Sequence, residues 1–542
     1  MAYFSLFYEN QEQENAAKKQ SQSQVYYRAK QKTQKKAYFV GSRMVMKEEA
    51  MNPSENMPSF FQDLNLEAVF LPEYEGNLSE DIRQLLFSFP QDIQTIIYRQ
   101  EIYQDLDKPA VYKGLTDFRN GFTEADRLLN YRLHSDHPLQ QGKYYLDAAV
   151  LYYQSIYKLY HILGEHADSA ALTSLLSILK AYLERKDYCE FCLQAESLKD
   201  KLEAIYCTLT IAGNVVKVSF ERSSEDFSGT VQSVFRQEKA CTNPVSLFNQ
   251  PALNQFENRL MSLVEKEYPK LCKEVIGFTA GSRPLIDATL IKLYKESEFF
   301  LSGHRIAERL KEKGFTLTYP DIQKQGGLYL QGICDIKLAL SAEKAKDIAL
   351  NDLVLQEGMK GAFITGANQG GKTTFARSAG QAVYLAMLGM PVIANKAQLC
   401  YFGGIYTHFT VEENQLVDNG KLLEELHHLK EILVSAPGKC LYILNEMFSS
   451  TTAADTYELT SLLLPQLLEK SGMVLCVTHV PELAEKRDGM ASLIAAVREE
   501  DGYKRNYKIE PGEAVLSARA IDIALKYHLS GEQIKERMSN GD

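Results

Sequence analysis

Residues 366–373 read Gly-Ala-Asn-Gln-Gly-Gly-Lys-Thr and carry the strongest local pattern of the chain. A glycine, four further residues and then Gly-Lys-Thr is the pattern of a phosphate-binding loop, which needs a strand before it and a helix after it. Residues 361–365 predict a short buried strand, and residues 374–386 predict a helix. A strand, a glycine turn and a helix N-terminus aim several backbone N–H groups and the helix dipole at one point, where polyphosphate binds.

The loop also predicts a role for each of its residues. We expect Lys372 to reach the β- and γ-phosphates of ATP and the hydroxyl of Thr373 to hold Mg²⁺. The alternative is a chance glycine turn, which the strand, the helix and the Lys-Thr pair together disfavour. The residues expected to bind the nucleotide are Gly366, Asn368, Gly370, Gly371, Lys372, Thr373 and Thr374.

A second apolar run ends in two polar residues that suit the same chemistry. Residues 439–446 read Lys-Cys-Leu-Tyr-Ile-Leu-Asn-Glu. Nucleotide hydrolases place acidic residues at such a strand end, one near Mg²⁺ and one to activate the attacking water. Glu446 is therefore the candidate catalytic base, and an exposed strand-end carboxylate is the alternative. Asn445 offers the metal an oxygen through a bound water but no charge, so we expect weak Mg²⁺ affinity and slow turnover.

The next predicted strand ends in a histidine. Residues 474–479 read Val-Leu-Cys-Val-Thr-His. At this position His479 can hydrogen-bond a γ-phosphate and sense its presence, whereas the alternative is a structural or merely exposed histidine. Between the two strands, residues 448–455 form a small polar loop that enters a helix and that, in a dimeric ATPase, would face the opposite subunit.

Composition sets the broad class of the protein. The chain has 542 residues, which predicts two to four domains, and 45% apolar with 24% charged residues is ordinary for a soluble globular protein. No apolar run of about 18 residues predicts a membrane helix, and the first residues lack the basic and apolar regions of a secretory signal. Nine scattered cysteines suit a reduced compartment. We therefore expect a cytoplasmic protein without a membrane partner.

One segment is strongly basic although the net charge is −10. Residues 16–47 contain nine lysines and arginines, no acidic residue and several aromatic residues. Such an arm can follow a nucleic-acid backbone, and a flexible solvated tail is an equally good interpretation. The lone Cys189-x-x-Cys192 pair has no second pair or nearby histidine to complete a metal or redox site.

The pattern changes along the chain and predicts its organisation. Residues 1–60 form the basic arm and residues 61–120 a core or connector. Residues 121–330 carry long amphipathic stretches around a β element at 208–235, which predicts a helical arm with a small β tip. From residue 331 to 542, short apolar strands alternate with helices, the α/β pattern of a nucleotide-binding domain.

Taken together, these segments resemble the MutS family of DNA mismatch repair ATPases, which is related to ABC-type ATPases. Residues 366–373 are similar to the family's G-P-N-M-x-G-K-S, residues 444–452 to its L-D-E-x-x-x-G-T-S, and residues 478–483 to its A-T-H-x-x-E-L. Weaker similarities, in the same order as in the family, are found at residues 90–101, 351–352, 389–394 and 517–538.

The resemblance implies a fold, partners and a mechanism. It implies an ABC-type phosphate-loop ATPase domain after a mainly helical lever and clamp region, with a C-terminal helical dimerisation element. It further implies a homodimer with two composite ATP sites, in which ATP closes the ATPase domains and drives a clamp on DNA in repair or recombination. The alternative is a nucleotide-gated structural or adaptor protein that hardly hydrolyses ATP.

Two departures from the family pattern limit what the resemblance implies. Only some sixty residues precede the core, so we expect no dedicated mismatch-reading domain, and Phe7-Tyr-Glu9 matches the family's Phe-x-Glu wedge by coincidence. DNA would then be bound by its shape or backbone. The family's Ser-Thr-Phe signature is replaced by residues 418–423, in which Lys421 is a candidate contact to the γ-phosphate in the partner subunit.

Overall fold

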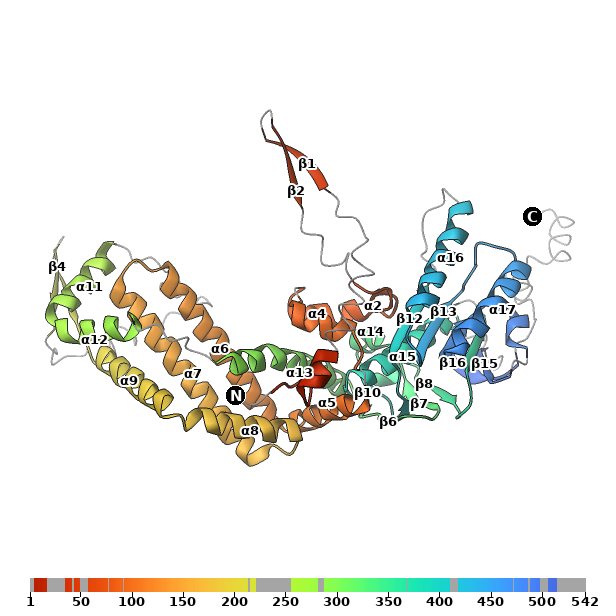
Figure 1. Ribbon diagram of the computed structural model, residues 1–542, viewed down its shortest axis with the longest axis horizontal. Helices are drawn as coiled ribbons and strands as arrows, with labels where there is room; N and C mark the ends of the chain where they lie inside the picture. The colour runs from red at the N-terminus through yellow and green to blue at the C-terminus, as the bar shows by residue number, and fades with distance from the viewer. Residues whose placement is uncertain are drawn as a thin grey trace, which may run out of the picture. The chain divides into compact units, whose positions relative to one another are not determined.

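Figure 1 shows the computed structural model of the chain. It describes residues 4–16, 35–40, 43–48, 57–76, 78–90, 92–212, 215–220, 255–280, 287–367, 369–409, 418–470, 472–485, 488–497 and 505–513. The chain divides into two compact units. The helical unit consists of Met1–Phe4 and Asp105–Glu298, and the α/β unit of Ser5–Gln104 and Phe299–Asp542. Among the described residues, no helix combines the length and the apolar character that crossing a membrane requires.

The α/β unit is built on a six-stranded sheet. Its first five strands are parallel, and the last strand is antiparallel to its neighbour. The order across the sheet is β12 (Gly404–Phe409), β13 (Cys440–Asn445), β14 (Met473–Val477), β9 (Gly361–Gly366), β15 (Met490–Val497) and β16 (Arg505–Pro511). The predicted strands at 361–365, 439–444 and 472–478 are confirmed as β9, β13 and β14. Because the carboxyl ends of parallel strands meet at one edge, the residues that follow them come close together.

Helices cover both faces of this sheet (Figure 1). The helix α15 (Lys372–Met387) lies on one face, where Gly380 allows its backbone to approach Ile443 closely. The helices α16 (Asp418–Ser435) and α17 (Ala453–Glu469) pack on the other face. That packing forms a buried apolar cluster, which includes Leu429, Tyr442, Leu444, Leu464 and Val474. Alternate residues of β13 thus face opposite helix layers, as the two-residue period of a strand requires.

A smaller mixed sheet lies against α15. Its order is β6 (Asp321–Gln323), β11 (Lys396–Cys400), β7 (Leu328–Ile333) and β8 (Asn351–Leu355), and β5 (Leu317–Thr318) pairs separately with β10 (Val392–Ile393). The short helix α14 (Ile336–Ser341) follows β7. Because α15 contacts strands of both sheets, nearly all of its residues are buried.

Residues before the helical unit complete the α/β unit. They form α2 (Ser59–Asp63), α3 (Leu66–Phe70), the 3₁₀ turn η2 (Leu71–Tyr74), α4 (Glu80–Phe87) and most of α5 (Ile93–Leu106). Tyr384 of α15 is the centre of their contact: its ring lies within about 6 Å of the rings of four phenylalanines, and its hydroxyl donates to the carbonyl of Leu86 at 2.8 Å. The phenylalanines are Phe60, Phe61, Phe70 and Phe89.

The start of the chain differs from the expected flexible arm. Leu6 and Phe7 are buried in the α/β unit, and the ring of Phe7 lies 5.7 Å from that of Phe299. Arg99 Nε donates to the carbonyl of Phe7 at 3.1 Å. Apolar side chains at these positions anchor the segment to the α/β unit. The basic composition of the following residues had led us to expect an arm over the whole of residues 1–60. Phe7 is therefore packed as a core residue, in agreement with a coincidental Phe-x-Glu match.

Only part of the expected basic arm lies within the described residues. β1 (Lys35–Val40) and β2 (Arg43–Glu48) form an antiparallel hairpin. Residues 17–34, which hold five of the nine basic residues, lie outside the described part of the chain.

The helical unit is dominated by two long helices. α6 (Pro109–His134) and α7 (Pro138–His166) are joined by three residues and pack along each other (Figure 1). The remaining helices are α8 (Ala170–Leu183), α9 (Lys186–Glu203), α11 (Gln255–Glu267), α12 (Pro269–Ala280) and the first part of α13 (Ala288–Glu312). α7, α9 and α12 share an apolar cluster that includes Leu146, Leu198 and Val275. The β element expected at the tip is present as an antiparallel hairpin of β3 (Thr208–Ala212) and β4 (Val215–Ser219). Residues 221–235 of the expected tip lie outside the described residues.

Candidate nucleotide site

The strand ends of the main sheet bring the predicted site residues to one edge. β13 and β14 pair with Asn445 opposite Val477, and β14 pairs with β9 with Val477 opposite Ile364. The phosphate-loop sequence, Asn445-Glu446 and Thr478-His479 therefore follow three adjacent parallel strands. The backbone N–H of Glu446 donates to the carbonyl of Val477 at 2.9 Å, which fixes the first residue after β13 to the neighbouring strand.

The loop between β9 and α15 needs its glycines. Gly366 and Gly371 have φ of +113° and +90°, values that glycine adopts at little cost. A Cβ on Gly370 would lie 2.8 Å from Cβ of Ala495 and 2.9 Å from the carbonyl of Ala367, which leaves no room for a side chain. Gly371 is the N-cap of α15 and supplies no side-chain cap. The first N–H groups of α15 are therefore candidates to bind an anion. Asn368 lies outside the described residues.

Lys372 closes the loop on itself. Its Nζ donates to the carbonyls of Gly366 at 2.8 Å and Ala367 at 3.1 Å, and its side chain is buried. Burial lowers the pKa of Lys372, whereas the charge of Glu446 raises it. The amine thus lies at the loop, where its hydrogen bonds to the two carbonyls can be replaced by bonds to phosphate oxygens.

Thr373 and Asn445 form the candidate metal position. The hydroxyl of Thr373 donates to Oδ1 of Asn445 at 2.8 Å. Two uncharged oxygens at this spacing suit a hard cation such as Mg²⁺, which prefers oxygen ligands and keeps several of its waters. Thr374 follows in the first turn of α15.

Glu446 and His479 meet directly. Nε2 of His479 lies 2.6 Å from Oε1 of Glu446, and both side chains are partly exposed. Glu446 has φ of +53° and Phe448 has φ of +56°. Such left-handed conformations cost non-glycine residues roughly 1–2 kcal/mol each and collect at functional sites. The two residues predicted separately from strand ends therefore form one close side-chain contact next to a strained turn.

Tyr507 also lies at the loop, although no sequence pattern indicated it. A Cβ on Gly371 would be 3.5 Å from Cδ1 of Tyr507, so the ring borders the end of the loop. The ring is half exposed, at 50%, and the backbone of Tyr507 has φ of +53°. Asn351 holds this backbone, because its amide donates to the carbonyl of Tyr507 at 3.1 Å and accepts from the N–H of Ile509 at 2.9 Å.

The comparisons with known proteins agree with this geometry. The family model of MutS domain V matches residues 362–535. Over its C-terminal half, the chain is therefore similar to proteins of the MutS family. It is 26% identical over 254 residues to the DNA mismatch repair protein MutS of Syntrophomonas wolfei, a match that covers 46% of this chain and 29% of the relative. It is 24% identical over 272 residues to MutS of Thermotoga petrophila, covering 50% and 32%.

A plant relative shows the same limited coverage. The DNA mismatch repair protein MSH3 of Arabidopsis thaliana is 33% identical over 141 residues, which is 26% of this chain and 13% of the relative. The chain thus matches about a third or less of the length of these relatives. Two features of the MutS resemblance lie outside the described residues: the side chain of Lys421 and the C-terminal helical element at 517–538.

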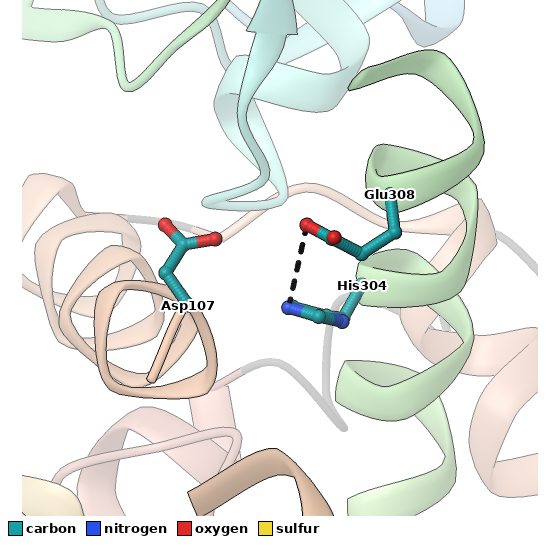
Figure 2. A group of neighbouring side chains, drawn as sticks. All are labelled: Asp107, His304 and Glu308. Atoms are coloured by element: carbon teal, nitrogen blue, oxygen red, sulfur yellow. Dashed lines mark ion pairs between the residues drawn. The ribbon is translucent and has the colours of Figure 1, made fainter. Parts of the chain in front are cut away.

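Two groups outside this edge carry metal-binding residue types. His304 and Glu308 lie one turn apart on α13, with Nε2 of His304 3.8 Å from Oε1 of Glu308 (Figure 2). Asp107, also drawn in Figure 2, belongs to the other unit. A pair of ligands is fewer than metal sites in proteins use. Burial raises the pKa of Cys192 to about 12, which makes its thiol a poor metal ligand or nucleophile, as expected for the lone cysteine pair.

Proposed function

We propose that this protein is an ATPase with an ABC-type phosphate-loop domain, which binds Mg²⁺ and ATP at the carboxyl edge of the main sheet. The observation that supports the proposal is the convergence of Lys372, the Thr373–Asn445 pair and the Glu446–His479 pair at that edge. Each pair joins residues far apart in the sequence. The sequence assigns these five residues to one nucleotide site from three separate segments, at 366–373, 439–446 and 474–479.

The residues have distinct tasks in the proposed reaction. The amine of Lys372 and the N–H groups of the loop bind the β- and γ-phosphates. Thr373 and, through a water, Asn445 would hold Mg²⁺, which would supply positive charge to the phosphate oxygens. Glu446 accepts the proton of the attacking water, and His479 holds the carboxylate of Glu446 and can donate to the γ-phosphate.

Tyr507 gives the proposed site a place for the base of the nucleotide. Its half-exposed ring borders Gly371, at the start of the helix that receives the phosphates. Aromatic side chains stack on nucleobases, a contact worth about 1–3 kcal/mol per base in nucleic-acid complexes. We therefore assign to Tyr507 a contact with adenine, held in place by Asn351.

The proposal extends to partners through the relatives, which are named as DNA mismatch repair proteins. We propose that the protein is a cytoplasmic homodimer that binds DNA by backbone or shape, and that ATP drives the helical unit as a clamp. The long pair of α6 and α7 is the feature of this unit that suits an arm around DNA. Positive charge on the arm at residues 16–47 would add phosphate contacts.

One observation favours a second function. Asn445 stands where hydrolases carry an acidic residue, so the site has less negative charge for the metal. A nucleotide-gated adaptor that binds ATP and turns it over very slowly would fit this substitution.

Turnover and DNA binding test the proposal together. We expect wild-type protein to hydrolyse ATP and to bind duplex, branched or single-stranded DNA differently with and without ATP. Lys372→Ala should abolish nucleotide binding, because the charge that offsets the phosphates is lost. Lys396→Ala, at an exposed lysine of β11, is the matched control and should leave binding unchanged. ATP affinity of wild-type strength in Lys372→Ala would overturn the site, and ATP binding without measurable turnover would favour the adaptor.

A further inference from the structure

We propose that Glu425, on α16, is a positioning residue that holds the catalytic turn in place for Glu446. This role rests on the ATPase activity proposed above and adds a residue from a different element to it. Glu425 carries no motif, and its carboxylate reaches the turn from a helix that covers the sheet.

The turn after β13 needs external support. Glu446 and Phe448 both have left-handed backbone conformations, at φ of +53° and +56°. Non-glycine residues keep such conformations only where neighbouring contacts hold them. Phe448 is 1% exposed and belongs to the apolar cluster under α16 and α17, so a change in its position moves the turn that carries Glu446.

Three sets of hydrogen bonds hold this turn. The N–H of Glu446 donates to Val477 of β14 at 2.9 Å. The carbonyl of Phe448 accepts from the hydroxyls of Thr451 at 3.0 Å and Thr456 at 3.1 Å. The N–H of Phe448 donates to Oε2 of Glu425 at 2.9 Å. The first two sets come from the neighbouring strand and from the loop and helix that follow the turn, whereas Glu425 ties the turn to α16.

α16 is itself fixed near Glu425. One turn along the helix, Nδ1 of His428 lies 3.0 Å from Nδ1 of His408 on β12. His408 is buried, with 4% of its surface exposed. Successive turns of the helix therefore contact the turn after β13 and the strand β12, and the carboxylate of Glu425 is presented from a fixed point. Burial raises the pKa of Glu425 and the bond from Phe448 lowers it, as expected for a half-buried carboxylate with a backbone donor.

A positioning role separates the rate of hydrolysis from nucleotide binding. Removal of the acceptor would release the turn and displace the carboxylate of Glu446 from the water it activates. A displacement of about 1 Å can cost on the order of 100-fold in rate. Lys372 and the phosphate loop would be unaffected, so the affinity for ATP would stay the same.

The test compares four variants by their kcat and KM for ATP. Glu425→Ala should lower kcat about 10- to 100-fold and leave KM and ATP affinity within about twofold. Glu425→Gln should restore most of kcat, because an amide oxygen also accepts from the N–H of Phe448. Glu424→Ala, at the exposed neighbouring glutamate, should match wild type. Glu425→Asp keeps the charge but shortens the side chain, so it should lose rate, and it replaces Glu425→Ala if that variant does not fold.

The outcomes separate this role from the function on which it rests. A wild-type kcat in both Glu425→Ala and Glu425→Asp would overturn the role of Glu425 and leave the ATPase assignment intact. An equal loss of kcat and ATP affinity, not restored in Glu425→Gln, would show a merely structural role. A wild-type protein that binds ATP without hydrolysing it would refute the proposed hydrolysis and this role with it.

Discussion

At the scale of single residues, Asn445 sets the charge of the position proposed for Mg²⁺. Its Oδ1 accepts the hydroxyl proton of Thr373 at 2.8 Å, so the two side chains hold each other in the position proposed for Mg²⁺. An amide oxygen contributes a dipole where a carboxylate would contribute a full charge. The geometry is thus retained while the electrostatic attraction for the cation is reduced.

Asn445→Asp restores that charge. The carboxylate can still accept from Thr373, and we expect Mg²⁺ affinity in the presence of ATP to rise by about tenfold, or roughly 1.4 kcal/mol, with no loss of ATPase activity. Titration of hydrolysis with Mg²⁺ measures both quantities. Asn445→Ala, which removes the acceptor, should shift the titration in the opposite direction. A collapse of activity in Asn445→Asp would mean that the rest of the site is adapted to the neutral amide.

Residues with a contiguous pattern could be predicted from the sequence, and residues without one could not. Lys372 and Thr373 belong to a motif, and Glu446 and His479 each end an apolar strand, so parallel pairing brings them together. The roles proposed for Tyr507 and Glu425 depend on contacts made only in the folded chain. Tyr507 depends on a left-handed backbone held by Asn351, and Glu425 on the packing of α16, neither of which leaves a local signal.

At the scale of elements, α16 and β12 are joined by a pair of neutral histidines. The pKa of His408 is lowered from 6.5 to about 4 by burial and by the neighbouring His428. Burial also lowers the pKa of His428, against the opposing charge of Glu431. An uncharged pair can share one Nδ1 proton in a hydrogen bond, whereas two charged rings would repel each other.

This pair predicts a loss of stability in mild acid. As the pH falls from 6.5 towards 4, the unfolded chain gains a proton on His408 that the native state does not, so the free energy of unfolding should fall by roughly 3 kcal/mol. Asp63 has the opposite effect on stability in this pH range, because burial raises its pKa from 3.8 to about 6. The folded chain therefore binds a proton at Asp63 that the unfolded chain does not, which raises the free energy of unfolding.

The contribution of the histidines to stability is therefore measured as the difference between wild type and a variant that lacks both of them. Urea unfolding between pH 4.5 and 7.5 should show a flatter pH dependence in His408→Gln/His428→Gln than in wild type, with Asp63 common to both. Parallel curves for the two proteins would show that the pair titrates alike in the folded and unfolded states.

Elements with a clear hydrophobic period were predictable, and those set by packing were not. The strands β9, β13 and β14 and the hairpin of β3 and β4 follow directly from apolar runs and turn residues. The buried segment at residues 5–8 was hidden by the basic stretch that follows it, since local composition does not show that Phe7 packs against Phe299. Tertiary contacts of this kind override a prediction from composition.

At the scale of the whole molecule, two of the connections between the two units run through helices. The chain leaves the α/β unit within α5 and returns to it within α13. Within the α/β unit, Gly389, in the segment that follows α15, closely approaches Arg99 of α5. The segment directly after the helix that begins at the phosphate loop thus lies against a helix that continues into the other unit, which suits the proposed ATP-driven clamp.

The central claim is that Glu446 activates the water that attacks ATP bound at the phosphate loop. Steady-state ATP hydrolysis by Glu446→Gln, at ATP concentrations that saturate binding, tests it most directly. The glutamine keeps the size and can still bond His479, but it accepts no proton, so turnover should fall by about 100-fold or more while ATP stays bound. Unchanged hydrolysis in Glu446→Gln would contradict the account, because another residue would then have to activate the water.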